Sequence, residues 1–167
     1  MRIRDEEERD RAAVREIVST EFDTGAEADL VDALRDEAEP CISLVAEEDG
    51  TVVGYAMFSP VTVDEHPDAK IMGLAPLVVL YDYQGRGIGS ALVHAGLERC
   101  RALGVLGVVV VGHPDYYPRF GFGPASRFGL RCEYDVPDEA FLALELVPGA
   151  LAGKAGTVRY HAAFGRL

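Results

Sequence analysis

"VVLYDYQGRGIGSALV" (residues 78–93) passes from strand-forming residues through three glycines into an apolar helical pattern. Gly85, Gly87 and Gly89 either form a turn too tight for side chains or let another group approach the backbone closely. A helix that begins at such a loop directs its first N–H groups outward, at the positive end of the helix dipole. The stretch therefore predicts an anion site of the kind that holds phosphate groups.

Two well-known phosphate loops do not fit this spacing. A P-loop needs a lysine directly after its last glycine, and none follows here. A dinucleotide fingerprint, G-x-G-x-x-G, belongs to the first strand–helix unit, whereas the G-x-G-x-G of residues 85–89 follows several expected strands. A nucleotide-binding oxidoreductase domain, which would bind NAD(H), stays open as an alternative. The pattern that remains is Q-x-x-G-x-G, formed by Gln84, Gly87 and Gly89.

Hydropathy patterns predict a mixed α/β domain that spans residues 1–167, with a sheet of six or seven strands. Asp49-Gly50 is a tight-turn signal and predicts a hairpin between the strands on its two sides. Residues 108–111 are continuously apolar, as in a strand buried on both faces, and we expect them beside strand 70–80 and parallel to it. The expected strands are 1–4, 41–48, 51–59, 70–80, 108–111, 130–134 and 140–146, with a short one near 158, and the expected helices follow residues 5, 25 and 87.

Pro76 lies inside the strand expected at residues 70–80. A central strand cannot spare a backbone N–H, so Pro76 predicts a bulge or a point where strand pairing stops.

Together these features resemble the GNAT superfamily, the Gcn5-related N-acetyltransferases. The resemblance is most specific over residues 70–125 and implies a mostly antiparallel sheet with a bulged, splayed central strand. It implies that acetyl-CoA binds with its pyrophosphate on the loop and its pantetheine arm along the strand. The acetyl-CoA-binding residues it implies are Leu77, Val78, Val79, Gln84, Gly85, Arg86, Gly87, Ile88, Gly89 and Ser90.

A second motif of this resemblance is "PDYYPRFGF" at residues 114–122. Many family members carry a tyrosine, three residues and then Gly-Phe after the buried strand, which matches Tyr117 here. The resemblance implies that Tyr117 protonates the departing thiolate of CoA. Full transfer from a phenol to a thiolate is uphill by roughly 2 kcal/mol, so a hydrogen bond to the sulfur is an equally good interpretation.

The proton acceptor is not specified by the sequence. An amine is mostly protonated at neutral pH, so some group must take up its proton. His113 at the end of the buried strand, Glu21 and Glu27 are the candidates, and a water held by backbone carbonyls serves equally well. No metal site is indicated.

The composition of the chain limits the classes of molecule that it can bind. The net charge of −12 excludes nucleic acid, which needs basic residues, and it either steers a cationic acceptor or only keeps the protein soluble. A charged N-terminus and the absence of a long apolar run predict no membrane association. Three scattered cysteines predict buried, reduced thiols and a cytoplasmic protein. The predicted function is direct transfer of an acetyl group to a small-molecule or peptide amine, in a possible homodimer. The alternative is a catalytically silent acyl-CoA-binding regulatory module of the same fold.

Overall fold

A computed structural model describes residues 1–22 and 24–167. The strands are β1 (Arg2–Asp5), β2 (Ile42–Glu48), β3 (Thr51–Val63), β4 (His66–Val79), β5 (Gly107–Val111), β6 (Gly123–Pro124), β7 (Leu130–Cys132), β8 (Phe141–Glu145) and β9 (Gly156–Arg159). The α-helices are α1 (Arg11–Phe22), α2 (Ala26–Glu37) and α3 (Ile88–Ala102). Short 3-10 helices are η1 (Glu8–Asp10), η2 (Tyr81–Tyr83), η3 (Tyr117–Phe120), η4 (Ala125–Phe128), η5 (Asp138–Ala140) and η6 (Ala162–Arg166).

The described strands form one mixed sheet in the order β1-β2-β3-β4-β5-β8-β6, and β9 pairs with both β3 and β7. Pairing is antiparallel except between β4 and β5 and between β7 and β9. The expected parallel neighbours β4 and β5 are therefore confirmed. The sheet has nine strands rather than six or seven, because the short strand expected near residue 158 joins it as β9 and because β6 is a two-residue strand too short to leave a pattern in the sequence.

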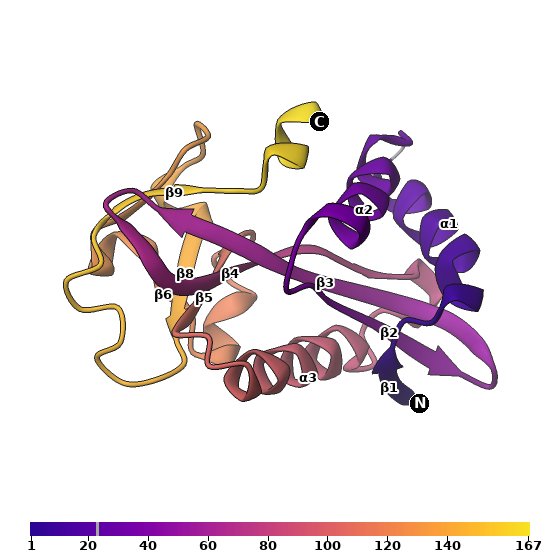
Figure 1. Cartoon of the computed structure of the whole chain (residues 1–167). Helices are drawn as coiled ribbons and strands as arrows, with labels where there is room; N and C mark the ends of the chain where they lie inside the picture. Colours follow the sequence, from indigo (N-terminus) through magenta and orange to yellow (C-terminus); the bar gives the residue numbers. More distant parts are fainter. Residues whose placement is uncertain (23) are drawn as a thin grey trace.

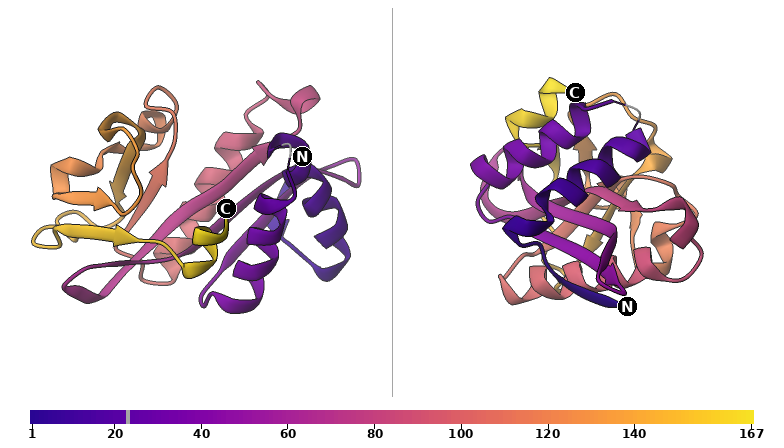
Figure 2. Two further views of the ribbon diagram at one scale, coloured as in Figure 1. Left: turned by 90° about the horizontal axis from the view of Figure 1, so that it is seen from above. Right: turned by 90° about the vertical axis from the view of Figure 1, so that its right-hand side faces the viewer.

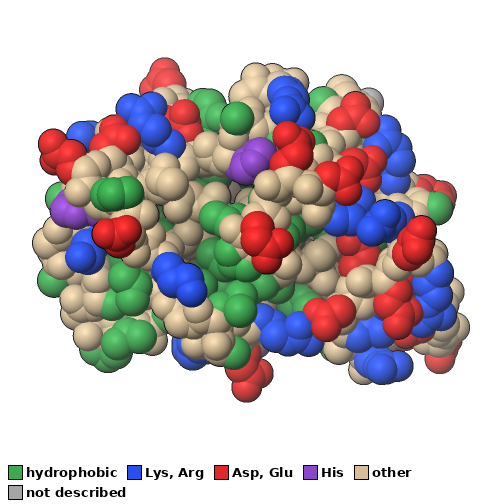
Figure 3. Space-filling view, in the orientation of Figure 1, with side chains coloured by type: hydrophobic (Ala, Val, Ile, Leu, Met, Phe, Trp, Pro, Cys, Tyr) green, Lys and Arg blue, Asp and Glu red, His purple; other side chains and the backbone are tan. Residues whose placement is uncertain are grey.

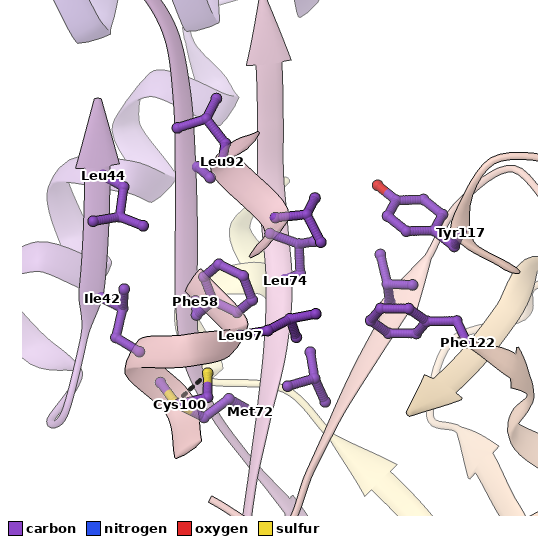
Figure 4. Packing of buried hydrophobic residues seen from close by; sticks show 14 of the residues in the cluster. Ile42, Leu44, Phe58, Met72, Leu74, Leu92, Leu97, Cys100, Tyr117 and Phe122 are labelled. Carbon is purple, nitrogen blue, oxygen red and sulfur yellow. Dashed lines mark hydrogen bonds between the residues drawn. The ribbon is translucent and has the colours of Figure 1, made fainter. Parts of the chain in front are cut away.

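Helices cover both faces of this sheet. Figure 1 shows α3 beneath the sheet and α1 with α2 above it, where the C-terminal η6 lies beside α2. Buried side chains of β2, β3 and β4 pack against the inner face of α3, as Figure 4 shows for Phe58, Leu92 and Leu97. Gly96 lets the ring of Phe58 lie directly against α3, because a Cβ at Gly96 would come within 2.0 Å of the ring.

The hairpin predicted at Asp49-Gly50 is present. β2 and β3 pair in antiparallel register from Ile42–Phe58 to Glu48–Thr51, and both turn residues have positive φ (52° and 79°). Asp and Gly tolerate that conformation, which a two-residue hairpin of this kind requires.

β4 stays paired with β3 on both sides of Pro76, but it loses its second partner, β5, before this residue. The sequence predicted such a bulge or loss of pairing. Its register with β3 shifts between Leu74 and Leu77, so a bulge surrounds Pro76. Its parallel pairing with β5 covers only Ile71–Gly73, after which the two strands separate. Figure 2 (left) shows the N-terminal helices at one end of the long β3–β4 hairpin and β6, β7 and β8, drawn in orange, at the other.

Charged side chains gather around α1, α2 and the N-terminus, where acidic and basic groups alternate (Figure 3). Many of them are paired, for example Arg15 with Asp29 and Asp32. The three cysteines are free, but only Cys100 is fully buried, whereas Cys41 and Cys132 are half-buried. Among the described residues, no helix is both long enough and apolar enough to span a bilayer.

Candidate active site

The glycine loop opens onto a cavity of about 450 Å³, here called the loop cavity. Nine residues predicted to bind acetyl-CoA line it, and they come from β4 and from the loop that leads into α3. These are Leu77, Val78, Val79, Gln84, Gly85, Gly87, Ile88, Gly89 and Ser90. The strand and the loop therefore face a common space.

The three glycines have two different reasons to be glycine. Gly85 and Gly87 have φ values of 77° and 81°, and a Cβ at either would meet no protein atom within 4 Å. These two glycines form the turn and leave open space in front of it. At Gly89 a Cβ would lie only 2.8 Å from the hydroxyl oxygen of Tyr116, so this glycine allows a close approach.

Backbone N–H groups of the loop are free to bind a ligand. The Ala91 N–H donates to the Gly87 carbonyl at 3.0 Å and begins the helical pattern of α3. Ile88, Gly89 and Ser90 precede that bond, so their N–H groups have no acceptor within the helix. The positive end of the α3 dipole adds to the attraction for an anion at this place.

Gln84 and Arg86 hold the loop in shape. The Gln84 side-chain amide donates to the Val79 carbonyl at 3.0 Å, which fastens the loop to the end of β4. The Arg86 guanidinium lies 4.9 Å from the centroid of the Tyr83 ring and donates to the Asp82 carbonyl. Arg86 alone among the ten residues predicted to bind acetyl-CoA does not line the loop cavity, because these contacts draw its side chain aside.

Within the part of the chain that the structure describes, no strand pairs with the β5-side edge of β4 beyond Pro76. Leu77, Val78 and Val79 pair with β3, and successive residues direct their backbone groups to alternate edges of a strand. The Leu80 N–H donates to the Val53 carbonyl of β3, so Leu77 and Val79 direct their backbone groups to the open edge, where the Val79 carbonyl already accepts a hydrogen bond from the Gln84 side chain. That edge offers hydrogen-bonding groups to an extended ligand.

Four further residues line the loop cavity: Glu21, Tyr83, Tyr116 and Arg119. The Arg119 guanidinium lies 4.3 Å from the centroid of the Tyr116 ring, and its Nε donates to the Tyr116 carbonyl. Arg119 is thus a positive group fixed beside the loop. Sequence reasoning considered Glu21 as a base but missed Tyr116 and Arg119 as cavity residues, although both lie inside the motif at residues 114–122.

Tyr117 is buried, with 8% of its surface exposed, and it does not line the loop cavity. Its ring packs against Gly112, where a Cβ would come within 2.4 Å of Cε2. In Figure 4 its hydroxyl points toward β4 beside Leu74, in the region where β4 and β5 separate. Burial raises the pKa of Tyr117 to about 12, so the phenol is protonated at neutral pH.

The remaining candidates for a base are not gathered around one point. His113 is exposed, does not line the loop cavity, and accepts backbone hydrogen bonds from Tyr116 and Tyr117 through its carbonyl. Glu27 accepts a hydrogen bond from the Thr24 hydroxyl and does not line the cavity either. Within residues 1–22 and 24–167, no group of three or more His, Cys, Asp or Glu side chains is arranged to hold a metal ion.

Comparison with known proteins identifies the class. Residues 11–122 match the model of the acetyltransferase (GNAT) family. The chain is 39% identical to the uncharacterized N-acetyltransferase YhbS of Escherichia coli strain K12, over 94% of both proteins. It is 40% identical to the uncharacterized N-acetyltransferase YjhQ of the same strain, over 78% of this chain and 74% of YjhQ.

Solved structures agree with this result. The structure of E. coli YhbS in complex with CoA superposes with a TM-score of 0.93, 38% identity, and coverage of 99% of this chain and 92% of that one. A GNAT acetyltransferase from Brucella melitensis in complex with acetyl-CoA gives a TM-score of 0.80, 37% identity, and coverage of 98% and 97%.

The chain therefore belongs to the GNAT acetyltransferase family, whose members are acetyl-CoA-dependent N-acyltransferases. The predicted fold class and enzyme class are confirmed. Neither the fold nor the relatives support a dinucleotide-binding oxidoreductase, because the glycine loop follows β4 of a mostly antiparallel sheet. The relatives likewise give no support to a silent binding module.

Proposed function

We propose that the loop cavity holds acetyl-CoA and that the acetyl group passes directly from its sulfur to an amine. One observation carries this proposal: the free N–H groups of the loop and the unpaired edge of β4 face a single cavity. A pyrophosphate and an extended pantetheine arm need these two kinds of surface side by side. The relatives that were solved with CoA and acetyl-CoA support the same ligand.

In this proposal the pyrophosphate lies on the backbone N–H groups of residues 85–90. Glycines at 85 and 87 keep the space in front of the loop free of side chains. Arg119 supplies the positive side chain that faces the cavity, a role first expected of Arg86. The pantetheine arm pairs with the open edge of β4 at Leu77 and Val79.

Tyr117 acts on the departing sulfur. With a pKa of about 12, proton transfer to a thiolate whose pKa is about 8.5 would be uphill by roughly 5 kcal/mol. Donation of a hydrogen bond avoids that cost and stabilises negative charge on the sulfur as the C–S bond breaks. We therefore assign Tyr117 as a hydrogen-bond donor to the leaving group rather than as a full proton donor.

The base is proposed to be Glu21 or a bound water rather than His113. Both side chains are exposed, but Glu21 lines the loop cavity, whereas His113 lies outside it.

We further propose a single domain over residues 1–167 that functions in the cytoplasm. The family match over residues 11–122 and the three free cysteines support this proposal. The proposal also includes a homodimer, and a small-molecule or peptide amine as the acceptor. The net charge of −12 argues against nucleic acid as the acceptor.

Two measurements test the function. Calorimetry with CoA and with NADH should show binding of CoA alone. Release of the CoA thiol from acetyl-CoA should then depend on an added amine and fall in Tyr117→Phe. CoA binding without thiol release for any amine would favour the silent binding module, and NADH binding would refute the proposed donor.

A further inference from the structure

A second cavity, of about 370 Å³, is lined in part by residues of β4 and β5 beyond the last pair that these two strands make. We call it the apolar cavity. Its nine described lining residues include Leu74, Ala75, Val111, Tyr134, Tyr160 and Phe164. None of its described lining side chains carries a charge, which is unusual on a chain with a net charge of −12.

The two cavities meet at the bulge of β4. Leu74 and Ala75 stand just before Pro76 and Leu77 just after it, so the two linings are about 10 Å or less apart along the strand. Val111 ends β5, beyond the last pair that β5 makes with β4. Leu74, which lines the apolar cavity, is also the residue toward which the Tyr117 hydroxyl points in Figure 4.

Aromatic rings from the last third of the chain line the apolar cavity. Tyr134 and Tyr160 stack with centroids 6.1 Å apart, and Phe164 packs against Tyr160 at 5.1 Å. Gly73 of β4 makes room for Tyr160, because a Cβ there would come within 2.9 Å of its ring. The rings are thus held in place by the sheet rather than by chance contacts at the surface.

Apolar side chains at this cavity are unusually exposed. Val111 and Tyr134 keep 45% and 41% of their surface exposed, and both line it. Exposed apolar groups that gather in a concave site of this size are typical of small-molecule sites.

From these observations we propose that the acceptor is a small primary amine that carries an aromatic or branched aliphatic group. Tyr134, Tyr160 and Phe164 are its specificity residues. This inference rests on the proposed function, because it assigns the second substrate of the same reaction. It also replaces the interpretation that the acidic surface steers a cationic acceptor, since a polyamine would place several charges against side chains none of which is a carboxylate.

The uncharged side chains of the apolar cavity also affect the protonation of the amine. An apolar environment disfavours an ammonium ion and lowers its pKa, so the amine loses its proton to water and becomes a nucleophile. Its nitrogen attacks the thioester carbonyl, a C–N bond forms, the C–S bond breaks, and the nitrogen gives its second proton to Glu21 or a bound water. The sulfur leaves with the bonding electron pair and is protonated from solvent, which gives an N-acetyl amide and free CoA.

An acceptor screen by thiol release tests this assignment. We expect 2-phenylethylamine and isopentylamine to exceed spermidine, lysine and a lysine peptide in kcat/KM by about tenfold or more. Stronger transfer to the cationic amines, or no transfer to either apolar amine, would overturn the proposal. CoA binding is measured in parallel, so a failure confined to the acceptor is distinguishable from a failure of the proposed function.

A matched pair of variants locates the acceptor. Val111→Asp puts a carboxylate in the apolar cavity, and Val147→Asp makes the same change at a valine that is 52% exposed outside it. We expect Val111→Asp to lower kcat/KM for 2-phenylethylamine about tenfold, with CoA affinity unchanged, and Val147→Asp to change neither. Equal activity of the two variants toward 2-phenylethylamine would refute the placement.

Discussion

Substitution of Gly87 by alanine separates the role of the loop in binding from its role in folding. Gly87 has a φ of 81°, and a methyl group there would enter the open space in front of the loop. The left-handed conformation costs a residue other than glycine about 1–2 kcal/mol. For a domain of this size, that loss lowers Tm by about 3 °C per kcal/mol.

Gly104 provides the matched control. It has a φ of 76°, it also has open space around its missing Cβ, and it follows the other end of α3. About 25 Å of helix separates it from Gly87. Gly104→Ala should therefore lose similar stability without touching the proposed phosphate site.

CoA affinity should separate the two variants. If the methyl group at residue 87 displaces one charge-assisted hydrogen bond from the pyrophosphate, about 1.5–3 kcal/mol is lost. That loss corresponds to CoA binding weakened by about 10- to 150-fold, whereas Gly104→Ala should stay within about twofold of the wild type. Calorimetric titration with CoA and thermal unfolding measure the two effects. A folded Gly87→Ala protein with wild-type CoA affinity would show that the loop does not hold the phosphates.

Three other predictions concern the chemistry and the core. Tyr117→Phe should lower kcat by about 10²-fold or more with CoA affinity unchanged. Tyr116→Phe alters the wall of the loop cavity and should change CoA affinity more than kcat. The reverse pattern would show that Tyr116, and not Tyr117, donates to the departing sulfur. Gly96→Ala should destabilise the fold by about 1–3 kcal/mol in a denaturant titration, because its methyl group collides with the Phe58 ring, and unchanged stability would contradict the packing. Burial raises the pKa of Cys100 to about 12, so iodoacetamide at pH 8 should alkylate this thiol only in the unfolded protein. The free energy of unfolding should also fall as the pH rises above 9, because the thiol ionises at a lower pH in the unfolded protein than in the folded one. Rapid alkylation of Cys100 in the native state would refute its burial.

Much of the fold could be predicted because its signals are local. Asp49 and Gly50 adopt the positive φ that a two-residue hairpin turn needs, so this pair specifies the hairpin. Pro76 has no backbone N–H to donate to a neighbouring strand, so it specifies the bulge in β4. The conformation of the glycine loop is likewise determined by six consecutive residues. β6 could not be predicted, since two residues show no alternation and the strand exists only because β8 pairs with it.

The site was predicted less completely, because side-chain direction depends on neighbours that the local sequence does not show. Arg86 was expected at the phosphate, but stacking on Tyr83 draws it aside, and Arg119 lines the cavity instead. His113 follows the buried strand, as expected, yet it is exposed.

The apolar cavity was missed for a different reason. Its residues come from β4, β5, the segment after β7 and the C-terminal turn, and no motif spans them. The only local signal was a set of apolar residues outside the regular strand and helix patterns, such as Val136 and Phe164.

The contact between Gly112 and Tyr117 bears on how such an enzyme can lose its activity. A single methyl group at residue 112 would meet the Tyr117 ring at 2.4 Å and force it to move, while the glycine loop and the open edge of β4 would remain intact. Gly112→Ala should therefore retain CoA and lose turnover. One mutation, at a residue that lines neither cavity, would then convert an acetyltransferase into a CoA-binding protein.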